Sequence, residues 1–320
     1  MRDPAPRECV IALDVGGTSM KGALFDSGLG FLSTLRRPTP RRSGPDAVVS
    51  AIAAALCAIK GHATARGLRI RATTVVVPGI VDEEAERAVY SANIGWRDLP
   101  LAALLRAATG LSLTVGHDIR AGGLAECGLG AARGARDVLF VPIGTSISGA
   151  VVCDGQAVRA GGYAGELGHM VVEPDGMPCP CGRRGCLETV ASAASIERAY
   201  ARRCGRPVKG ALEVAALVAQ GDREARLIWR RAVGALARAL TAYSTLLAPE
   251  VIVVGGGLAE AGGLLLDPLR ARLAEELTFQ RRPTVLRAEL GDQAACFGAG
   301  LRAWQEASRT AAGSAPDAAP

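Results

Sequence analysis

The chain has 320 residues, which is longer than one ordinary hydrophobic core requires and long enough for two domains. Hydrophobic residues make up 49% of it and charged residues 21%, and this composition excludes a disordered chain. The formal net charge is +6, but no run of five basic residues occurs. We therefore interpret the charge as a solvated arginine-rich surface and expect no nucleic-acid partner.

The sequence also indicates the compartment in which the protein works. The first apolar stretch, Cys9 to Leu13, ends at Asp14 and is too short for the core of a signal peptide. The most apolar region, 245–266, contains Pro249, two glutamates and three consecutive glycines, so we expect no membrane span and no membrane partner. We expect a cytoplasmic protein whose nine cysteines form no disulfide scaffold.

The first half of the chain is predicted to begin with a hairpin. An apolar strand over 10–15 runs into Gly16 and Gly17, and a second strand over 20–25 follows at hairpin distance. Beyond it, the pattern predicts a strand at 31–35, a helix at 45–59, a strand at 70–77, a helix at 99–109 and a strand at 111–115.

The second half of the chain repeats this beginning. A strand over 138–143 meets a tight turn at Gly144 and Thr145, and a strand over 147–153 follows. Two halves that each open with strand, glycine turn and strand indicate an internally duplicated fold. The remaining predicted elements are helical segments over 187–220, 222–247, 264–277 and 294–305 and a buried strand over 251–254.

We expect these elements to form two lobes and a tail. The smaller N-terminal lobe is expected to comprise 1–116 and 293–306, and the larger C-terminal lobe 117–292. The last segment, 307–320, is rich in alanine, serine and proline and is expected to be disordered.

Three glycine-bearing turns at strand ends are candidates for binding a nucleotide. Glycine lets backbone N–H groups approach phosphate oxygens without an intervening Cβ, a threonine hydroxyl adds a donor, and an acidic residue at a strand end can orient Mg²⁺. Any one of these turns alone is also compatible with an ordinary hairpin or a helix start. The candidate nucleotide-binding residues are Asp14, Gly16, Gly17, Thr18, Gly144, Thr145, Gly255, Gly256 and Gly257.

The most specific pattern in the chain is a set of four metal ligands. Cys179, Cys181 and Cys186 lie within eight residues, and His169 precedes them. Four such ligands suit a tetrahedral Zn²⁺ and leave no open position, so the ion is expected to be structural. The alternative, a set of ordinary buried cysteines, is disfavoured because the other six cysteines show no such clustering.

Three carboxylates are candidates for recognising a polyol. Asp118 follows a strand end, Glu166 lies between glycines, and Glu188 comes just after the cysteine loop. A single carboxylate is normally a surface charge, but rigidly held acceptors next to a metal loop are what sugar recognition requires.

Taken together, these motifs resemble the ROK family, which contains bacterial glucokinases, fructokinases, N-acetylhexosamine kinases and sugar-responsive repressors. The resemblance extends to about residue 306, and its most specific segments are Gly-Glu-x-Gly-His and Cys-x-Cys-Gly-x-x-Gly-Cys-x-Glu. The residues that carry it are 14–18, 78–79, Asn93, His117, Asp118, 144–145, 165–169, Cys179, Cys181, Cys186, Glu188 and 255–257.

The resemblance implies an α/β, actin-like and ribonuclease H-like sugar kinase fold with two lobes and a structural zinc loop. It implies an ATP-dependent hexokinase that uses Mg²⁺, with glucose as the leading substrate and another hexose, such as fructose or an N-acetylhexosamine, as the alternative. Asp118 is then the general base, Asn93, Glu166, His169 and Glu188 hold the sugar hydroxyls, and His169 also binds zinc. A homo-oligomer, dimer or tetramer, is typical of the family.

Two departures from the family pattern affect this expectation. His117 replaces the usual asparagine, and its imidazole either binds a sugar hydroxyl and alters which sugar fits or is tolerated without effect. Ser146 and Ser148 replace two glycines of the second phosphate turn. If Ser146 adopts a positive φ, strain of about 1 kcal/mol and weaker nucleotide binding are expected.

Two further function classes remain open at this stage. A ROK-type repressor carries a helix-turn-helix module before the first glycine motif, and only 13 residues precede Asp14, which favours the kinase. A sugar sensor with weak or no catalysis is the other alternative, and it is motivated by Ser146 and Ser148.

Overall fold

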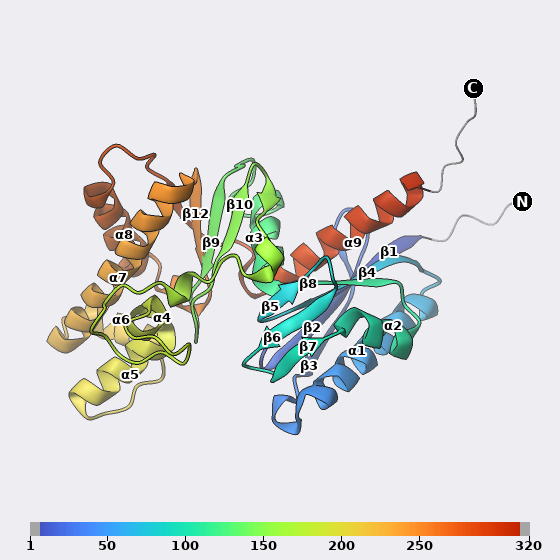
Figure 1. The fold of residues 1–320 in the computed structure, drawn as a ribbon, viewed down its shortest axis with the longest axis horizontal. Coiled ribbons are helices and arrows are strands. Elements are labelled where there is room, and N and C mark those ends of the chain that lie inside the picture. Colours follow the sequence, from blue (N-terminus) through green and yellow to red (C-terminus); the bar gives the residue numbers. More distant parts are fainter. Residues whose placement is uncertain (1–6, 314–320) are drawn as a thin grey trace, which may run out of the picture. The chain divides into compact units, whose positions relative to one another are not determined.

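The computed structural model describes residues 7–313, which form two compact units (Figure 1). Among the described residues, unit 1 is built from 7–125, 159–163 and 293–313, and unit 2 from Glu126–Val158 and Ala164–Asp292. The expected lobe boundary before His117 therefore falls too early, because the first turns of the helix that follows belong to unit 1.

Unit 1 is organised around a five-stranded sheet in the order β3-β2-β1-β4-β8. The first three strands form an antiparallel meander, whereas β4 and β8 run parallel to β1. Apolar residues occupy almost all of β1, as expected for a strand covered on both faces. The strands are β1 (Glu8–Val15), β2 (Ser19–Phe25), β3 (Phe31–Pro38), β4 (Arg69–Val77) and β8 (Leu113–His117).

Helices cover both faces of this sheet. Alternate residues of β1 point to opposite faces, so Ile11 and Leu13 pack with α1 and α2 while Val10 and Ala12 pack with α9. Helix α1 begins with a proline at its first position and ends before Gly67, which has a φ of 61°. The helices are α1 (Pro45–Ala65), α2 (Leu101–Thr109) and α9 (Ala294–Gly313).

Helix α1 is also long and apolar enough to cross a membrane by length and composition, with a mean hydropathy of 1.5. The sequence expectation of no membrane span considered only the region 245–266 and overlooked this helix. In the structure, the helix buries Val48, Ile52, Leu56 and Ile59, at helical spacing, in the core of unit 1. This is the arrangement of a core helix.

A small antiparallel sheet in unit 1 was missing from the sequence expectation. It consists of β5 (Ile80–Asp82), β6 (Arg87–Ser91) and β7 (Trp96–Leu99) in chain order. The charged turn between β5 and β6 hides the alternating pattern, and Trp96 is buried where the sheet packs into the core. Because β7 ends at Leu99, helix α2 begins at Leu101, two residues later than expected.

Unit 2 contains a second five-stranded sheet in the order β11-β10-β9-β12-β13. Here too the first three strands are antiparallel, and β12 and β13 run parallel to β9. The two sheets thus share one strand order, which confirms the expected internal duplication. The strands are β9 (Val138–Pro142), β10 (Ala150–Cys153), β11 (Gln156–Ala157), β12 (Val251–Gly255) and β13 (Thr284–Arg287).

The helices of unit 2 include two breaks that the sequence expectation missed. The segment 187–220 is three helices, because Ser192 caps a new helix through its side chain and Gly205 ends that helix in the left-handed conformation. Helix α7 begins after Asp222, whose carboxylate accepts from the Ala225 N–H at 2.7 Å. The helices are α4 (Leu187–Ala191), α5 (Ala193–Cys204), α6 (Ala211–Ala219), α7 (Arg223–Leu247) and α8 (Gly263–Glu276).

The C-terminal helix is longer than the sequence predicted. Helix α9 continues to Gly313 and buries Ala307, so the expected disorder from residue 307 is wrong over 307–313. Beyond the expected end the helix still contacts the sheet, because Arg71 of β4 donates to the Ala307 carbonyl oxygen at 3.5 Å. The rest of that expected tail, 314–320, lies outside the described residues.

Candidate active site

The turn between β1 and β2 carries the first group of candidates. Asp14 is buried at the end of β1, and its carboxylate lies 3.7 Å from the Lys21 ammonium. The Gly16 N–H donates to the Ser19 carbonyl oxygen at 2.9 Å, and a Cβ on Gly16 would lie 3.0 Å from that oxygen. Gly17 has open space around it, so this turn presents backbone to solvent, as phosphate binding requires.

Asp118 begins helix α3 (Asp118–Gly128) directly after β8. Its side chain is 15% exposed, and its Oδ1 accepts from the Ile119 N–H at 2.7 Å. Burial, and secondarily the negative charge of Asp14, raise the pKa of Asp118 to about 7. A carboxyl group with this pKa is a much better proton acceptor than an ordinary aspartate.

His117 lies just before Asp118 and is 5% exposed. Its Nδ1 accepts from the Arg120 N–H at 3.3 Å, and its Nε2 lies 3.5 Å from Asp118 Oδ1. Burial lowers the pKa of His117 to about 3, with a smaller contribution from the Arg120 charge, so the imidazole is neutral at physiological pH.

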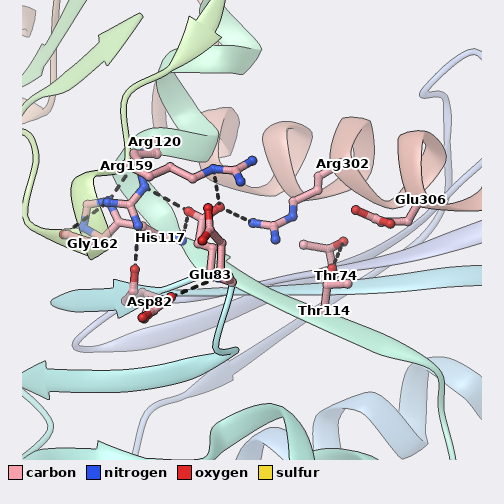
Figure 2. Close-up of polar contacts among 12 residues, drawn as sticks. Thr74, Asp82, Glu83, Thr114, His117, Arg120, Arg159, Gly162, Arg302 and Glu306 are labelled. Carbon is pink, nitrogen blue, oxygen red and sulfur yellow. Dashed lines mark hydrogen bonds and ion pairs between the residues drawn. The ribbon is translucent and has the colours of Figure 1, made fainter. Parts of the chain in front are cut away.

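A buried carboxylate, Glu83, lies behind these residues and was missing from the sequence expectation (Figure 2). It accepts from Arg120 Nε at 2.9 Å, from Arg302 Nη1 at 2.6 Å and from the His117 N–H at 3.2 Å. Arg159 lies 3.4 Å away. Burial raises the pKa of Glu83, but the charges of Arg302 and Arg120 outweigh it, so that pKa lies below its usual value.

The corresponding turn of unit 2 lies between β9 and β10. The Gly144 N–H donates to the Ser146 carbonyl oxygen at 2.9 Å, and Thr145 and Ser146 are exposed. Ser146 is not among the residues of 7–313 with positive φ, so the expected backbone strain is wrong: the turn closes with this residue in an ordinary conformation.

The glycine triplet of unit 2 lines a cavity of about 190 Å³. Gly256 has a φ of 74°, and a Cβ there would lie 2.5 Å from the Ile143 carbonyl oxygen. Only glycine therefore allows β12 to turn this close to the end of β9. The cavity is lined by Gly255, Gly256, Gly257, Ala259, Glu260, Arg287, Ala288, Gly291 and Asp292.

The four candidate metal ligands lie together in unit 2. The donor atoms of His169, Cys179, Cys181 and Cys186 all lie within 4.8 Å of one another. The Cys181 and Cys186 sulfurs are 3.6 Å apart, and His169 Nδ1 is 3.5 Å from Cys179 Sγ. Usual zinc bond lengths give separations of about 3.8 Å and about 3.6 Å in a tetrahedral site, so the donor set fits Zn²⁺.

The other polar candidates of unit 2 are tied to this cluster and to the β9–β10 turn. Glu188 Oε2 accepts from the Ile147 N–H at 3.2 Å, and Glu166 Oε2 lies 3.9 Å from His169 Nε2. The Gly149 N–H donates to the Gly165 carbonyl oxygen at 2.7 Å, where no Cβ would fit. One histidine nitrogen thus faces the thiols and the other faces Glu166.

The structure therefore gathers the candidates into two groups. His117 and Asp118 lie at one end of the unit 1 sheet, and the metal ligands with Glu166 and Glu188 lie together in unit 2. Asn93 is an exposed residue of unit 1 in the loop between β6 and β7. 

A model of the ROK family matches residues 10–306. The chain belongs to the ROK family. It is 33% identical over 311 residues to the glucokinase of Thermotoga maritima, a match that covers 92% of this chain and 96% of the relative. It is 32% identical over 268 residues to the N-acetylmannosamine kinase of Salmonella typhimurium, covering 83% of this chain and 88% of the relative.

Solved ROK structures confirm the expected fold class. A ROK family glucokinase from Streptomyces griseus in complex with glucose and AMPPNP matches with a TM-score of 0.79 and 29% identity, covering 93% of this chain and 99% of that one. The actin-like, ribonuclease H-like sugar kinase architecture is therefore shared over nearly the whole chain. The resemblance of the motifs to the ROK family, first seen in the sequence, is thereby confirmed.

Proposed function

We propose that this chain is an ATP-dependent hexose kinase, with glucose as its leading substrate and glucose 6-phosphate as the product. The observation that carries the proposal is Asp118, a partly buried carboxylate at the end of a central strand with a pKa raised to about 7. The ROK glucokinases that the chain resembles support glucose as the substrate.

In this mechanism Asp118 accepts the proton of the attacking sugar hydroxyl. Its Oδ1 is already occupied by the Ile119 N–H, so the proton goes to Oδ2. Phosphoryl transfer needs little covalent help. The carboxylate aligns the hydroxyl and takes its proton as the new P–O bond forms and the bond from the γ-phosphorus to the departing ADP oxygen breaks.

The nucleotide would be held by glycine turns and by a metal ion. The triplet 255–257 provides backbone N–H groups around the cavity of unit 2, and the turn at Gly16 and Gly17 provides them in unit 1. Asp14 fits a Mg²⁺ site, because it is a carboxylate at a strand end beside that turn, and Mg²⁺ binds few protein ligands. Bound Mg²⁺ would neutralise charge on the phosphates.

The sugar hydroxyls would be recognised by Glu166, His169 and Glu188 of unit 2 and by Asn93 of unit 1. A structural Zn²⁺ on His169 and the three cysteines would fix the orientation of the imidazole, whose Nε2 then donates to Glu166 or to the sugar. This role for the metal is positional and involves no bond to the substrate.

N-acetylmannosamine is the second candidate substrate, and it is favoured by the 32% identity to a kinase of that name. An N-acetyl group requires space next to C2 of the sugar, whereas glucose carries a hydroxyl there. We further propose a cytoplasmic homo-oligomer, as the family resemblance implies. A sugar-sensing regulator with weak catalysis is the remaining alternative.

The test is a coupled assay of ATP consumption over a panel of glucose, mannose, fructose, N-acetylglucosamine and N-acetylmannosamine. We expect glucose to have the highest kcat/KM, and mass spectrometry to show the 6-phosphate. A higher kcat/KM for N-acetylmannosamine than for glucose would make N-acetylmannosamine the leading substrate. No turnover with any hexose, together with measurable sugar binding by calorimetry, would identify a sensor and overturn the proposal.

A further inference from the structure

The residue before the proposed base is a histidine with one ring nitrogen hydrogen-bonded and the other close to the base. Nδ1 accepts from the Arg120 N–H, which is the contact that an N-cap side chain makes three residues into a helix. An accepting Nδ1 carries no proton, so the neutral ring has its proton on Nε2. That N–H lies 3.5 Å from Asp118 Oδ1.

We propose that His117 is a positioning residue for the general base: its Nε2–H holds Asp118 Oδ1, so that Oδ2 faces the substrate hydroxyl. This inference rests on the proposed kinase function and deepens it. An asparagine side chain offers the same pair of groups, an oxygen that caps the helix and an N–H that can reach the next carboxylate. His117 therefore offers the same pair of groups as the asparagine usual at this position.

Glu83 holds His117 in this orientation. It accepts from the His117 backbone N–H and from the guanidinium of Arg120. The backbone N–H of the same arginine donates to His117 Nδ1. Arg120 is 2% exposed and also donates to the carbonyl oxygens of Val81, at 2.9 Å, and Gly162, at 3.3 Å. Contacts from β5, from the β5–β6 turn and from Gly162 thus fix Arg120. Figure 2 shows its side chain beside Glu83 and Gly162.

Burial is the main reason that the imidazole is neutral, and the surrounding charges act in both directions. Arg120 lies on α3 and disfavours a second positive charge, whereas Glu83 on the β5–β6 turn acts in the opposite direction. The Asp118 carboxylate lies 3.5 Å from Nε2, close enough to attract the N–H of a neutral ring, and Arg302 on α9 pairs with Glu83. A neutral donor of fixed tautomer is therefore what this environment supports.

Two substitutions separate this role from plain helix capping. Serine is an equally good N-cap, but its hydroxyl is too short to reach Asp118, so His117→Ser should lower kcat between about tenfold and a hundredfold with little change in the sugar KM. His117→Asn restores both groups and should recover kcat to within a few-fold of wild type. Thermal melting of both variants checks that they fold.

The outcomes distinguish the inference from the function on which it rests. An unchanged kcat and KM for His117→Ser would show that His117 only caps helix α3. A raised sugar KM with an unchanged kcat would show that it binds the sugar. Either result overturns the inference while the kinase function stands, whereas a wild-type enzyme without turnover overturns the function itself.

A spectroscopic measurement tests the tautomer independently of turnover. The chain has three histidines, so ¹⁵N spectra of the imidazoles can be assigned by comparison with His117→Asn. We expect a neutral Nε2–H tautomer for His117 throughout pH 5 to 8. A proton on Nδ1, or a charged ring at pH 7, would overturn the inference.

Discussion

The sheets of the two units have the same strand order, but their turns are stabilised in different ways. In unit 1, ion pairs and buried carboxylates surround the ends of β1 and β8, and Glu83 binds three arginines there. In unit 2, the turn after β9 is held by close backbone contacts at Gly165 and Gly256 and by Glu188, whose carboxylate accepts from the Ile147 N–H. The proposed proton acceptor thus belongs to one copy of the duplicated scaffold, and most of the proposed sugar ligands belong to the other.

The comparison is tested most strongly by removing the proton acceptor of unit 1. Asp118→Asn keeps the size of the side chain but cannot take a proton, so kcat should fall at least about a hundredfold with little change in KM. Steady-state kinetics measure this, with Asp46→Asn, in the first turn of α1, as a control. If Asp118 only starts helix α3, asparagine will serve equally well, and more than about a tenth of kcat will remain.

Removing a ligand from unit 2 should change stability as well as affinity. Cys181→Ser leaves three ligands, so we expect the zinc content to fall from about one per chain and the melting temperature to drop by several degrees. The sugar KM should rise about tenfold, because the same loop positions Glu188. Elemental analysis, melting and kinetics test this against Cys57→Ser, an exposed cysteine of α1. Active wild-type protein without zinc would contradict it.

The backbone contacts of unit 2 can be tested with two glycines of nearly equal φ. Gly256 has a φ of 74° and Gly155 a φ of 75°, but only at Gly256 would a Cβ meet backbone atoms. Gly256→Ala should weaken ATP binding about tenfold or more, whereas Gly155→Ala should carry only the cost of its φ, about 1 kcal/mol of stability. Equal ATP affinities in the two variants would show that the close contact at Ile143 is unimportant.

The pH dependence of turnover tests the carboxylate environment of unit 1. Because the pKa of Asp118 is raised to about 7, the accepting form is lost as the pH falls through that value. At pH 6 about a tenth of Asp118 is ionised and at pH 8 about nine-tenths, so kcat/KM should rise about tenfold between them. A profile flat from pH 5 to 8 would show an ordinary pKa, and the residual activity of Asp118→Asn should lack this rise.

The smallest effect is expected at the β9–β10 turn. Ser146 has no positive φ, so Ser146→Gly relieves no strain, and the KM for ATP should stay within about twofold of wild type. Nucleotide titration measures this. A clearly tighter ATP affinity would mean that the turn changes its backbone conformation when the nucleotide binds.

Local patterns in the sequence predicted the parts of the fold and site that depend on neighbouring residues. The hairpin turns follow from glycines between apolar strands, and the metal ligands follow from cysteines within eight residues. The division between units was placed too early, before His117, because a helix that passes from one unit to the other leaves no break in its own pattern.

The sequence could not predict the residues that support Asp118. Glu83 and Arg302 are 219 positions apart, and Glu83 and Arg120 are 37 apart, so only the folded sheet brings them together. A glutamate next to two other acidic residues in a turn looks like surface charge. The long-range ion pairs that bury it have no periodic signature in the chain.

The position of α9 has a consequence for the order in which the protein is made. Val10, Ala12 and Phe25 of the first strands are covered by Cys296, Ala299 and Ala303, which the ribosome adds after the whole of unit 2. Domains usually fold during synthesis from the N-terminus onward. Here unit 1 is completed last. One face of its sheet remains exposed until α9 is synthesised, whereas unit 2 can already fold.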